Sequence, residues 1–223
     1  MDLVRILRSL EEFLYEVMTW LVFYPRMLLR TVTGPIGVMA YSRAEMEKPN
    51  VEDRYADAIS PPLFLILTMV VGHLIEIAAD LHPGSEVTGP AAGLFASDQS
   101  LVIIRSLMFA LFPLVFAIQQ MKVSGVALTR EGLRGPFFGA CFPAAAFCLV
   151  VSLGATLQQL NAGGPILGQG VSLAAALWYL VVQYRWLSGY GAGRARAAVM
   201  VIVGFLQAAT VVLFVGAALV FAR

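Results

Sequence analysis

Three ionisable residues stand close together in an otherwise apolar stretch of this chain, VGHLIEIAAD at residues 71–80. His73 and Glu76 are three residues apart, and Asp80 follows about one turn later, so on a helix all three point to nearly the same side. Ionisable groups are costly in hydrocarbon and mark a working site, an internal ion pair or the hydrated end of a helix. The elements that carry these residues decide which chemistry applies.

The composition indicates a membrane protein. Of 223 residues, 59% are hydrophobic and only 13% are charged, and the mean hydropathy is +0.80. A soluble domain carries about twice that share of charge, so most of this surface must face lipid or other apolar helices. The net charge of +1 gives no reason to expect nucleic acid as a partner.

Five segments are apolar enough, and close enough to the required length of about 20 residues, to cross a bilayer. They are residues 61–80, 101–121, 136–158, 169–185 and 197–221. The predicted fold class is therefore all-α, with a five-helix transmembrane bundle over residues 60–223. Pro113 and Pro143 are expected to kink the second and third spans.

Basic residues alternate between the two sides of these spans. Seven precede the first span, none lies between the first and second, and three lie in the next gap. The gap after that again has none, and the last has three. The positive-inside rule then places the N-terminus in the cytoplasm and the C-terminus outside. We expect a multi-pass protein of the bacterial inner (cytoplasmic) membrane.

Residues 1–30 are predicted to form a different kind of helix, in which polar residues recur at three- and four-residue spacing and the other faces are apolar. The polar stripe is Arg5, Arg8, Glu12, Glu16 and Thr19. We predict an amphipathic helix on the inner leaflet whose arginines contact anionic lipid headgroups. Those arginines are Arg5, Arg8, Arg26 and Arg30. The alternative is a sixth span, which would bury the charged stripe and invert the orientation.

Residues 31–59 are predicted to be a cytoplasmic linker between this helix and the bundle. Gly34-Pro35 marks a turn, and a short helix is expected in the following AYSRAEMEK. Asn50 is a candidate cap for a second short helix that runs through Ala58.

Two stretches carry a family resemblance. WYLVVQYRWLSGYGAGRARAAV, residues 178–199, resembles the junction of the fourth and fifth spans in bacterial members of the Ypt-interacting-protein (Yip) family. ISPPLFLILTMVVG, residues 59–72, is similar to their entry into the first span. The resemblance implies five closely spaced spans after a cytoplasmic segment, no known catalysis and, in eukaryotes, a link to membrane traffic and small GTPases. The Asp-Leu-Tyr-Gly-Pro signature of eukaryotic members is absent, and only Gly34-Pro35 is similar to it.

Arg105, in the predicted second span, matches Glu76 in depth if the first two spans form a hairpin. Each lies about 7 Å outside the midplane, from a rise of about 1.5 Å per residue. An ion pair between them would remove two unpaired charges from hydrocarbon and would act as an internal strut. Two other interpretations stay open: His73, Glu76 and Arg105 line an outward-facing polar cavity, or the charges snorkel to the interface without pairing. His73 is the deepest of these groups in its span and has no predicted partner.

Other chemistry has little support in the sequence. His73 and Glu76 make half of a metal site, but the further donors are Asp80 and His82, and a Pro-Gly pair after His82 indicates a loop. Phosphate-loop and dinucleotide motifs are missing, and no serine or cysteine has a histidine nearby in the sequence. We therefore predict no metal, no cofactor and no enzymatic activity.

Two milder features lie within the spans. Gln207 is near the middle of the fifth span, where it makes an interhelical hydrogen bond or lines a substrate path. Small residues recur at every fourth position of the third span and predict a packing seam, within the bundle or between protomers. The seam is centred on Ala144, Cys148 and Ser152.

Together these patterns favour a non-enzymatic integral membrane protein that organises or assembles membrane partners or lipids. Its expected partners are membrane lipids, a second copy of the chain or a partner membrane protein. One alternative is a small oligomeric transporter or channel of permease type that uses the polar cluster in the outer half of the first two spans. A membrane enzyme that acts on lipid would need the same cluster to reach the headgroups.

Overall fold

The computed structural model describes residues 2–56, 58–81, 97–160 and 164–221, with side chains from residue 8 to residue 218. Every element in these ranges is a helix, which confirms the all-α prediction. The helices are α1 (Asp2–Thr33), α2 (Pro35–Glu47), α3 (Pro61–Ala78), α5 (Asp98–Phe109), α6 (Leu111–Ser124), α7 (Arg130–Gln159), α8 (Gly164–Gly189) and α9 (Arg194–Phe221).

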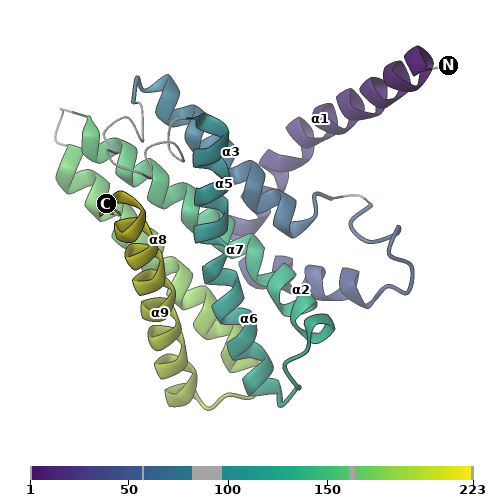
Figure 1. Cartoon of the computed structure of the whole chain (residues 1–223). Coiled ribbons are helices and arrows are strands. Elements are labelled where there is room, and N and C mark those ends of the chain that lie inside the picture. The colour runs from purple at the N-terminus through teal and green to yellow at the C-terminus, as the bar shows by residue number, and fades with distance from the viewer. Residues whose placement is uncertain (1, 57, 82–96, 161–163, 222–223) are drawn as a thin grey trace.

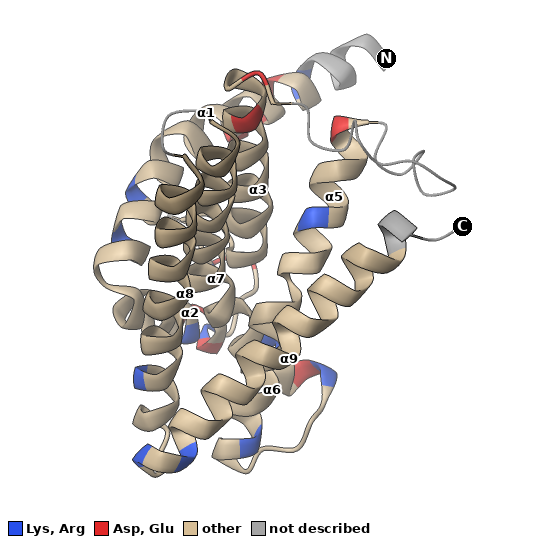
Figure 2. Ribbon diagram, turned by 90° about the vertical axis from the view of Figure 1, so that its left-hand side faces the viewer, with Lys and Arg blue, Asp and Glu red and all other residues tan. Residues whose placement is uncertain are grey.

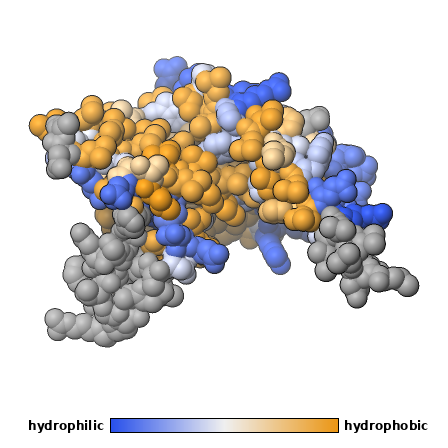
Figure 3. Space-filling view, turned by 90° about the horizontal axis from the view of Figure 1, so that it is seen from above, coloured by the Kyte–Doolittle hydropathy of each residue, from blue (hydrophilic) through white to orange (hydrophobic). Residues whose placement is uncertain are grey.

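Among the described residues, five helical segments are long and apolar enough to cross a membrane, so the five predicted spans are confirmed and the chain is a multi-pass membrane protein. They are α3, the α5–α6 pair, α7, α8 and α9. Successive spans run in alternating directions (Figure 1). Charged residues are sparse along the helices (Figure 2), and the face seen from above is largely hydrophobic (Figure 3).

The second span is broken into α5 and α6 at Ala110. Pro113 explains the break, because it has no N–H to donate to the carbonyl of Phe109 and its ring crowds that carbonyl. The chain continues across the break through a hydrogen bond from the Leu114 N–H to the Ala110 carbonyl, at 3.2 Å. The kink expected from Pro113 is therefore a short interruption of the helix.

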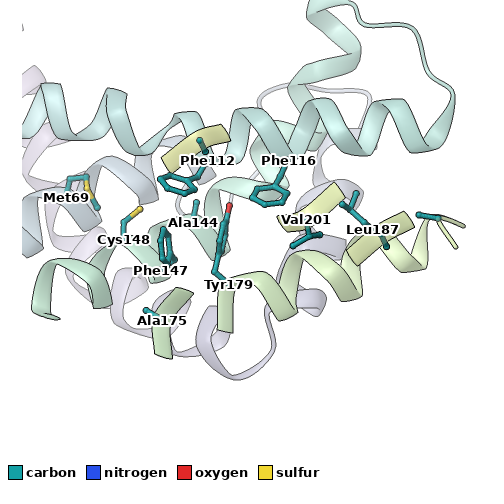
Figure 4. Close-up of a cluster of buried hydrophobic side chains, with 13 residues drawn as sticks. Met69, Phe112, Phe116, Ala144, Phe147, Cys148, Ala175, Tyr179, Leu187 and Val201 are labelled. Carbon is teal, nitrogen blue, oxygen red and sulfur yellow. The ribbon is translucent and has the colours of Figure 1, made fainter. Parts of the chain in front are cut away.

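α7 lies in the middle of the bundle and contacts α1, α2, α3, α6 and α8. Its central side chains are buried, and Ala144 and Cys148 are fully enclosed in an apolar cluster shared with α6, α8 and α9. Figure 4 shows the Tyr179 ring between Phe147 and Phe116. The centroid of the Tyr179 ring lies 4.8 Å from that of Phe147 and 5.4 Å from that of Phe116.

The small residues of α7 let neighbouring helices approach closely. Ser152 faces α3, where a Cβ placed on Gly72 would lie 3.5 Å from the Ser152 Cβ, at ordinary contact distance. On α8 the approach is closer. A Cβ on Gly168 would collide with the carbonyl oxygen of Gly154, and a Cβ on Gly154 would lie only 2.8 Å from the Gly168 carbonyl oxygen. Glycine is therefore required on both helices at this contact.

α1 is anchored to the bundle only through its C-terminal part and projects away from it at its N-terminal end (Figure 1). Side chains from residue 8 through residue 16 are exposed. Packing begins near Trp20, and Tyr24 contacts Phe64 of α3 with ring centroids 5.2 Å apart. The helix ends at Thr33, and α2 starts two residues later.

The linker contains one short helix, α2, and the second predicted short helix is wrong. Residues 51–56 form turns instead. Glu45, buried in α2, accepts hydrogen bonds from the Lys48 ammonium at 2.8 Å and from the Tyr55 N–H at 2.7 Å. The Asn50 amide donates to the Asp53 carboxylate at 3.0 Å rather than capping a helix. These bonds fold the segment back onto α2.

We expect Glu45→Gln to loosen this segment. Burial alone would raise the pKa of Glu45, but the hydrogen bonds from Lys48 and from the Tyr55 N–H outweigh burial and lower it. A lowered folded-state pKa means that the carboxylate stabilises the fold above pH 4.5, its ordinary pKa, and that this is lost as the pH falls through the lowered value. Hydrogen exchange should show less protection of the Tyr55 amide in Glu45→Gln at neutral pH.

The matched control is Glu47→Gln. The Glu47 carboxylate is exposed and pairs with Arg43 on the surface at 3.1 Å, so its loss should leave the Tyr55 amide unchanged. Acidifying the wild-type protein should reproduce the Glu45→Gln protection factors. Equal protection in wild type and Glu45→Gln would show that Glu45 does not hold the segment.

Candidate functional site

The structure brings Glu76 and Arg105 together between α3 and α5, which pack against each other. Glu76 is 5% exposed, and its Oε2 accepts a hydrogen bond from the Arg105 guanidinium at 2.5 Å. The Arg105 side chain is 27% exposed and reaches the carboxylate from the edge of the bundle. The geometry is that of an internal ion pair, with charge-assisted hydrogen bonding.

His73 has neighbours that the sequence did not predict. Its Nδ1 lies 3.6 Å from Glu76 Oε2, and its Nε2 lies 3.3 Å from Oδ1 of Asp98 in the first turn of α5. The sequence proposed no partner for His73, and the structure places Asp98 beside it. Neither ring nitrogen is aligned for a hydrogen bond, although both are buried. The imidazole lies between two carboxylates.

Asp98 was not predicted to lie near His73. In an antiparallel hairpin, a residue deeper in the membrane than Glu76 is matched in depth by a residue that follows Arg105 in the sequence, whereas Asp98 precedes Arg105. A usable signal was present: Asp98 and Arg105 are seven residues apart, two turns on the same face of one helix. The start of α5 is fixed locally, because the Ser97 hydroxyl accepts a hydrogen bond from the Ser100 N–H at 3.2 Å. That cap places Asp98 in the first turn, where a carboxylate also suits the helix dipole.

Four residues therefore form the ionic cluster of this protein: His73, Glu76, Asp98 and Arg105. Two carboxylates therefore lie beside one guanidinium and one imidazole. Within the described ranges, no three His, Cys, Asp or Glu side chains are arranged to hold a metal ion.

The remaining candidate residues are placed apart from the ionic cluster. Asp80 is exposed just beyond the end of α3, and His82 lies outside the described residues. Gln207 is exposed on α9, which packs on α6 and α8 rather than on α3. Arg8, Arg26 and Arg30 are exposed on α1. The side chain of Arg5 lies outside those that the structure describes.

A cavity that the sequence did not indicate opens at the other end of the bundle, between α2, α6, α7 and α8. Its volume is about 600 Å³. The Trp186 indole donates to the Gln120 side-chain oxygen at 2.8 Å, and Arg43 donates to the Tyr190 hydroxyl at 3.2 Å. Residues of α2, α6, α7 and α8 line the cavity, so no local sequence pattern could have predicted it.

Comparison of this chain with protein-family models, with curated proteins and with solved structures found no match.

Proposed function

We propose that this chain is a non-enzymatic integral membrane protein that organises lipids and partner membrane proteins. The observation that carries the proposal is α1, a 32-residue helix whose large apolar side chains between Leu10 and Val22 are mostly exposed. Leu10 is 50% exposed, Phe13 is 58% exposed and Leu21 is 66% exposed. A surface of this kind requires lipid or another apolar partner to cover it.

The amphipathic pattern of α1 supports lipid as the immediate partner. Charged side chains that include Arg8, Glu12 and Glu16 share one stripe, so the helix can lie in the headgroup region with this stripe facing water. A spanning position would place the same charges in hydrocarbon, at a cost of about 2.5–3.5 kcal/mol for each at the centre of a span. Only the part of α1 near the bundle would then be fixed by protein contacts.

The orientation is part of the same proposal. The alternation of basic residues supports an N-terminus in the cytoplasm, a C-terminus outside and residence in the bacterial inner membrane. α1 would then lie on the inner leaflet. The local resemblance to the Yip family agrees with a non-catalytic role of this kind.

One observation favours a second candidate, a small oligomeric permease. The two ring nitrogens of His73 are buried without a hydrogen bond, a costly arrangement that is often kept for moving protons. The position of Gln207 argues against a shared path, because it lies on the exposed face of α9 while His73 lies between α3 and α5.

Labels on the two faces of α1 test the proposal. A polarity-sensitive fluorophore on Cys introduced as Leu14→Cys should report hydrocarbon in anionic nanodiscs, and the same label on Glu16→Cys should report water. The native Cys141 and Cys148 are fully buried and leave the labels specific. If both labels report water, α1 does not dock on lipid. If both labels report hydrocarbon, α1 is a sixth span.

A second measurement addresses the partners. The variant Phe13→Asp/Leu21→Asp removes the apolar face of α1 and should release membrane proteins that co-purify with the wild type in mild detergent. If the chain is instead a proton-coupled permease, Phe13→Asp/Leu21→Asp should leave proton uptake into liposomes unchanged. His73→Gln should abolish that uptake.

A further inference from the structure

A second cavity lies where α1, α2 and the end of the linker meet, and we call it the junction cavity. Its volume is about 370 Å³. Its apolar lining includes Phe23, Met27 and Ile59, and its basic lining is Arg26, Arg30 and Lys48. Met27 and Ile59 are buried whereas both arginines are exposed, so the cavity has an apolar floor and a basic rim.

The two arginines at the rim have no anionic partner among the described residues. Arg26 and Arg30 are one turn apart on α1, and within the described part of the chain neither makes an ion pair. The Arg30 guanidinium lies over the ring of Tyr41, 5.8 Å from its centroid, which holds it beside the cavity. By contrast, Arg43 and Arg105 each pair with a glutamate of this chain.

Lys48 completes the rim and is fixed in place. Its ammonium donates to the Glu45 carboxylate at 2.8 Å and to the Asp53 carbonyl oxygen at 3.1 Å, which leaves a third proton for another acceptor. Glu45 is the acidic residue in the lining. Three cations therefore face one carboxylate, and the cavity carries an excess of two positive charges.

We propose that the junction cavity binds the phosphate group of an anionic phospholipid. Guanidinium groups one turn apart suit the bidentate recognition of phosphate oxygens, and a free phosphate ion would use this rim equally well. The apolar floor favours the lipid, because it can take the glycerol and upper acyl carbons that a free ion lacks. This assignment rests on the proposed function, since it requires α1 to lie at a lipid surface.

The test compares full-length variants by native mass spectrometry after transfer from nanodiscs into mild detergent, with phosphatidylglycerol as the probe. Wild type should retain one phosphatidylglycerol, and Arg26→Gln/Arg30→Gln should bind it at least tenfold more weakly. The charge-matched control Arg194→Gln/Arg196→Gln removes two exposed arginines at the start of α9, away from α1 and from the cavity, and should bind within twofold of wild type. Equal weakening in both double variants would overturn the site.

Further arms separate the possible ligands. Displacement of phosphatidylglycerol by an equal concentration of inorganic phosphate would overturn the lipid assignment, and equal retention of phosphatidylcholine would overturn the requirement for net negative charge. If Arg26→Gln/Arg30→Gln fails to fold, Arg26→Lys/Arg30→Lys keeps both charges and removes the guanidinium forks. This variant should bind phosphatidylglycerol several-fold more weakly than wild type. If it binds the lipid as tightly as wild type, the guanidinium groups do not recognise the phosphate.

A last arm distinguishes failure of the cavity from failure of the proposed function. Phe13→Asp/Leu21→Asp alters the exposed face of α1 and touches no residue of the junction cavity. In this variant, the fluorophore on Leu14→Cys should no longer report hydrocarbon, but the protein should still retain phosphatidylglycerol. Loss of lipid in this variant would show that retention comes from the α1 surface and not from the cavity.

Discussion

Glu76→Gln is expected to lower the free energy of unfolding by about 3 kcal/mol, the size of effect seen when one partner of a buried ion pair is removed. The variant leaves the Arg105 guanidinium between α3 and α5 without its anion. It also removes one of the two carboxylates that flank His73. Arg105 is 27% exposed, so part of the penalty can be relieved by movement toward the interface, and the effect lies at the lower end of the usual range.

Asp80→Asn is the matched control for this prediction. Asp80 lies about one turn beyond Glu76, is exposed and has a backbone φ of 59°. Asparagine tolerates that left-handed conformation as aspartate does, so the change should stay within about 0.5 kcal/mol. Equilibrium unfolding in mixed detergent micelles measures both variants.

The charge reversal Glu76→Arg/Arg105→Glu decides what the pair does. As a strut, it should recover most of the stability lost in either single variant, because the same two charges again meet between the helices. If Glu76→Gln is as stable as wild type, the pair is not a strut. If the reversal restores stability but abolishes proton uptake into liposomes, the ionic cluster is a working site, and the permease candidate gains over the organiser.

The predictable part of this site follows from spacing and depth. Charges are expensive in hydrocarbon, so a glutamate and an arginine at equal depth on consecutive spans are expected to meet, and Glu76 and Arg105 do. The partner of His73 could not be obtained in this way. Asp98 reaches the ring because α5 does not follow the simple antiparallel register against α3, and a crossing geometry depends on side-chain packing along both helices.

The same division holds for the rest of the fold. Hydropathy identifies the five spans because a bilayer sets a length and an apolar composition, both of which are local properties of the sequence. The turns at residues 51–56 depend instead on a buried carboxylate ten residues from Tyr55, so the local helix signal at Asn50 was misleading. Both cavities are built by groups from separate helices.

The sequence does not show which glycines of a span are required for close helix packing. The fourth span begins with Gly164, Gly168 and Gly170 within seven residues. Only contact with a neighbour tells them apart: a Cβ on Gly170 would have no atom within 4 Å, whereas a Cβ on Gly168 would run into the backbone of α7. The two positions should therefore respond to the same substitution with opposite signs.

Gly168→Ala is expected to destabilise the bundle by about 1–3 kcal/mol, the range for overpacking a tight interior contact. The added methyl would meet the carbonyl oxygen of Gly154 and lie 2.9 Å from the backbone nitrogen of Gln158. A helix backbone cannot rotate away as a side chain can, so α7 and α8 must separate. This is the most extensive helix–helix contact among the described elements, and the separation would loosen the bundle broadly.

Gly170→Ala supplies the opposite result on the same helix. Alanine is favoured over glycine in a helix by up to about 1 kcal/mol, and the new methyl group meets no protein atom here. Unfolding in mixed micelles should therefore show a gain at position 170 and a loss at position 168. A gain at both positions would mean that α7 and α8 do not approach through Gly154 and Gly168, and that the small residues of α7 serve a contact with another molecule instead.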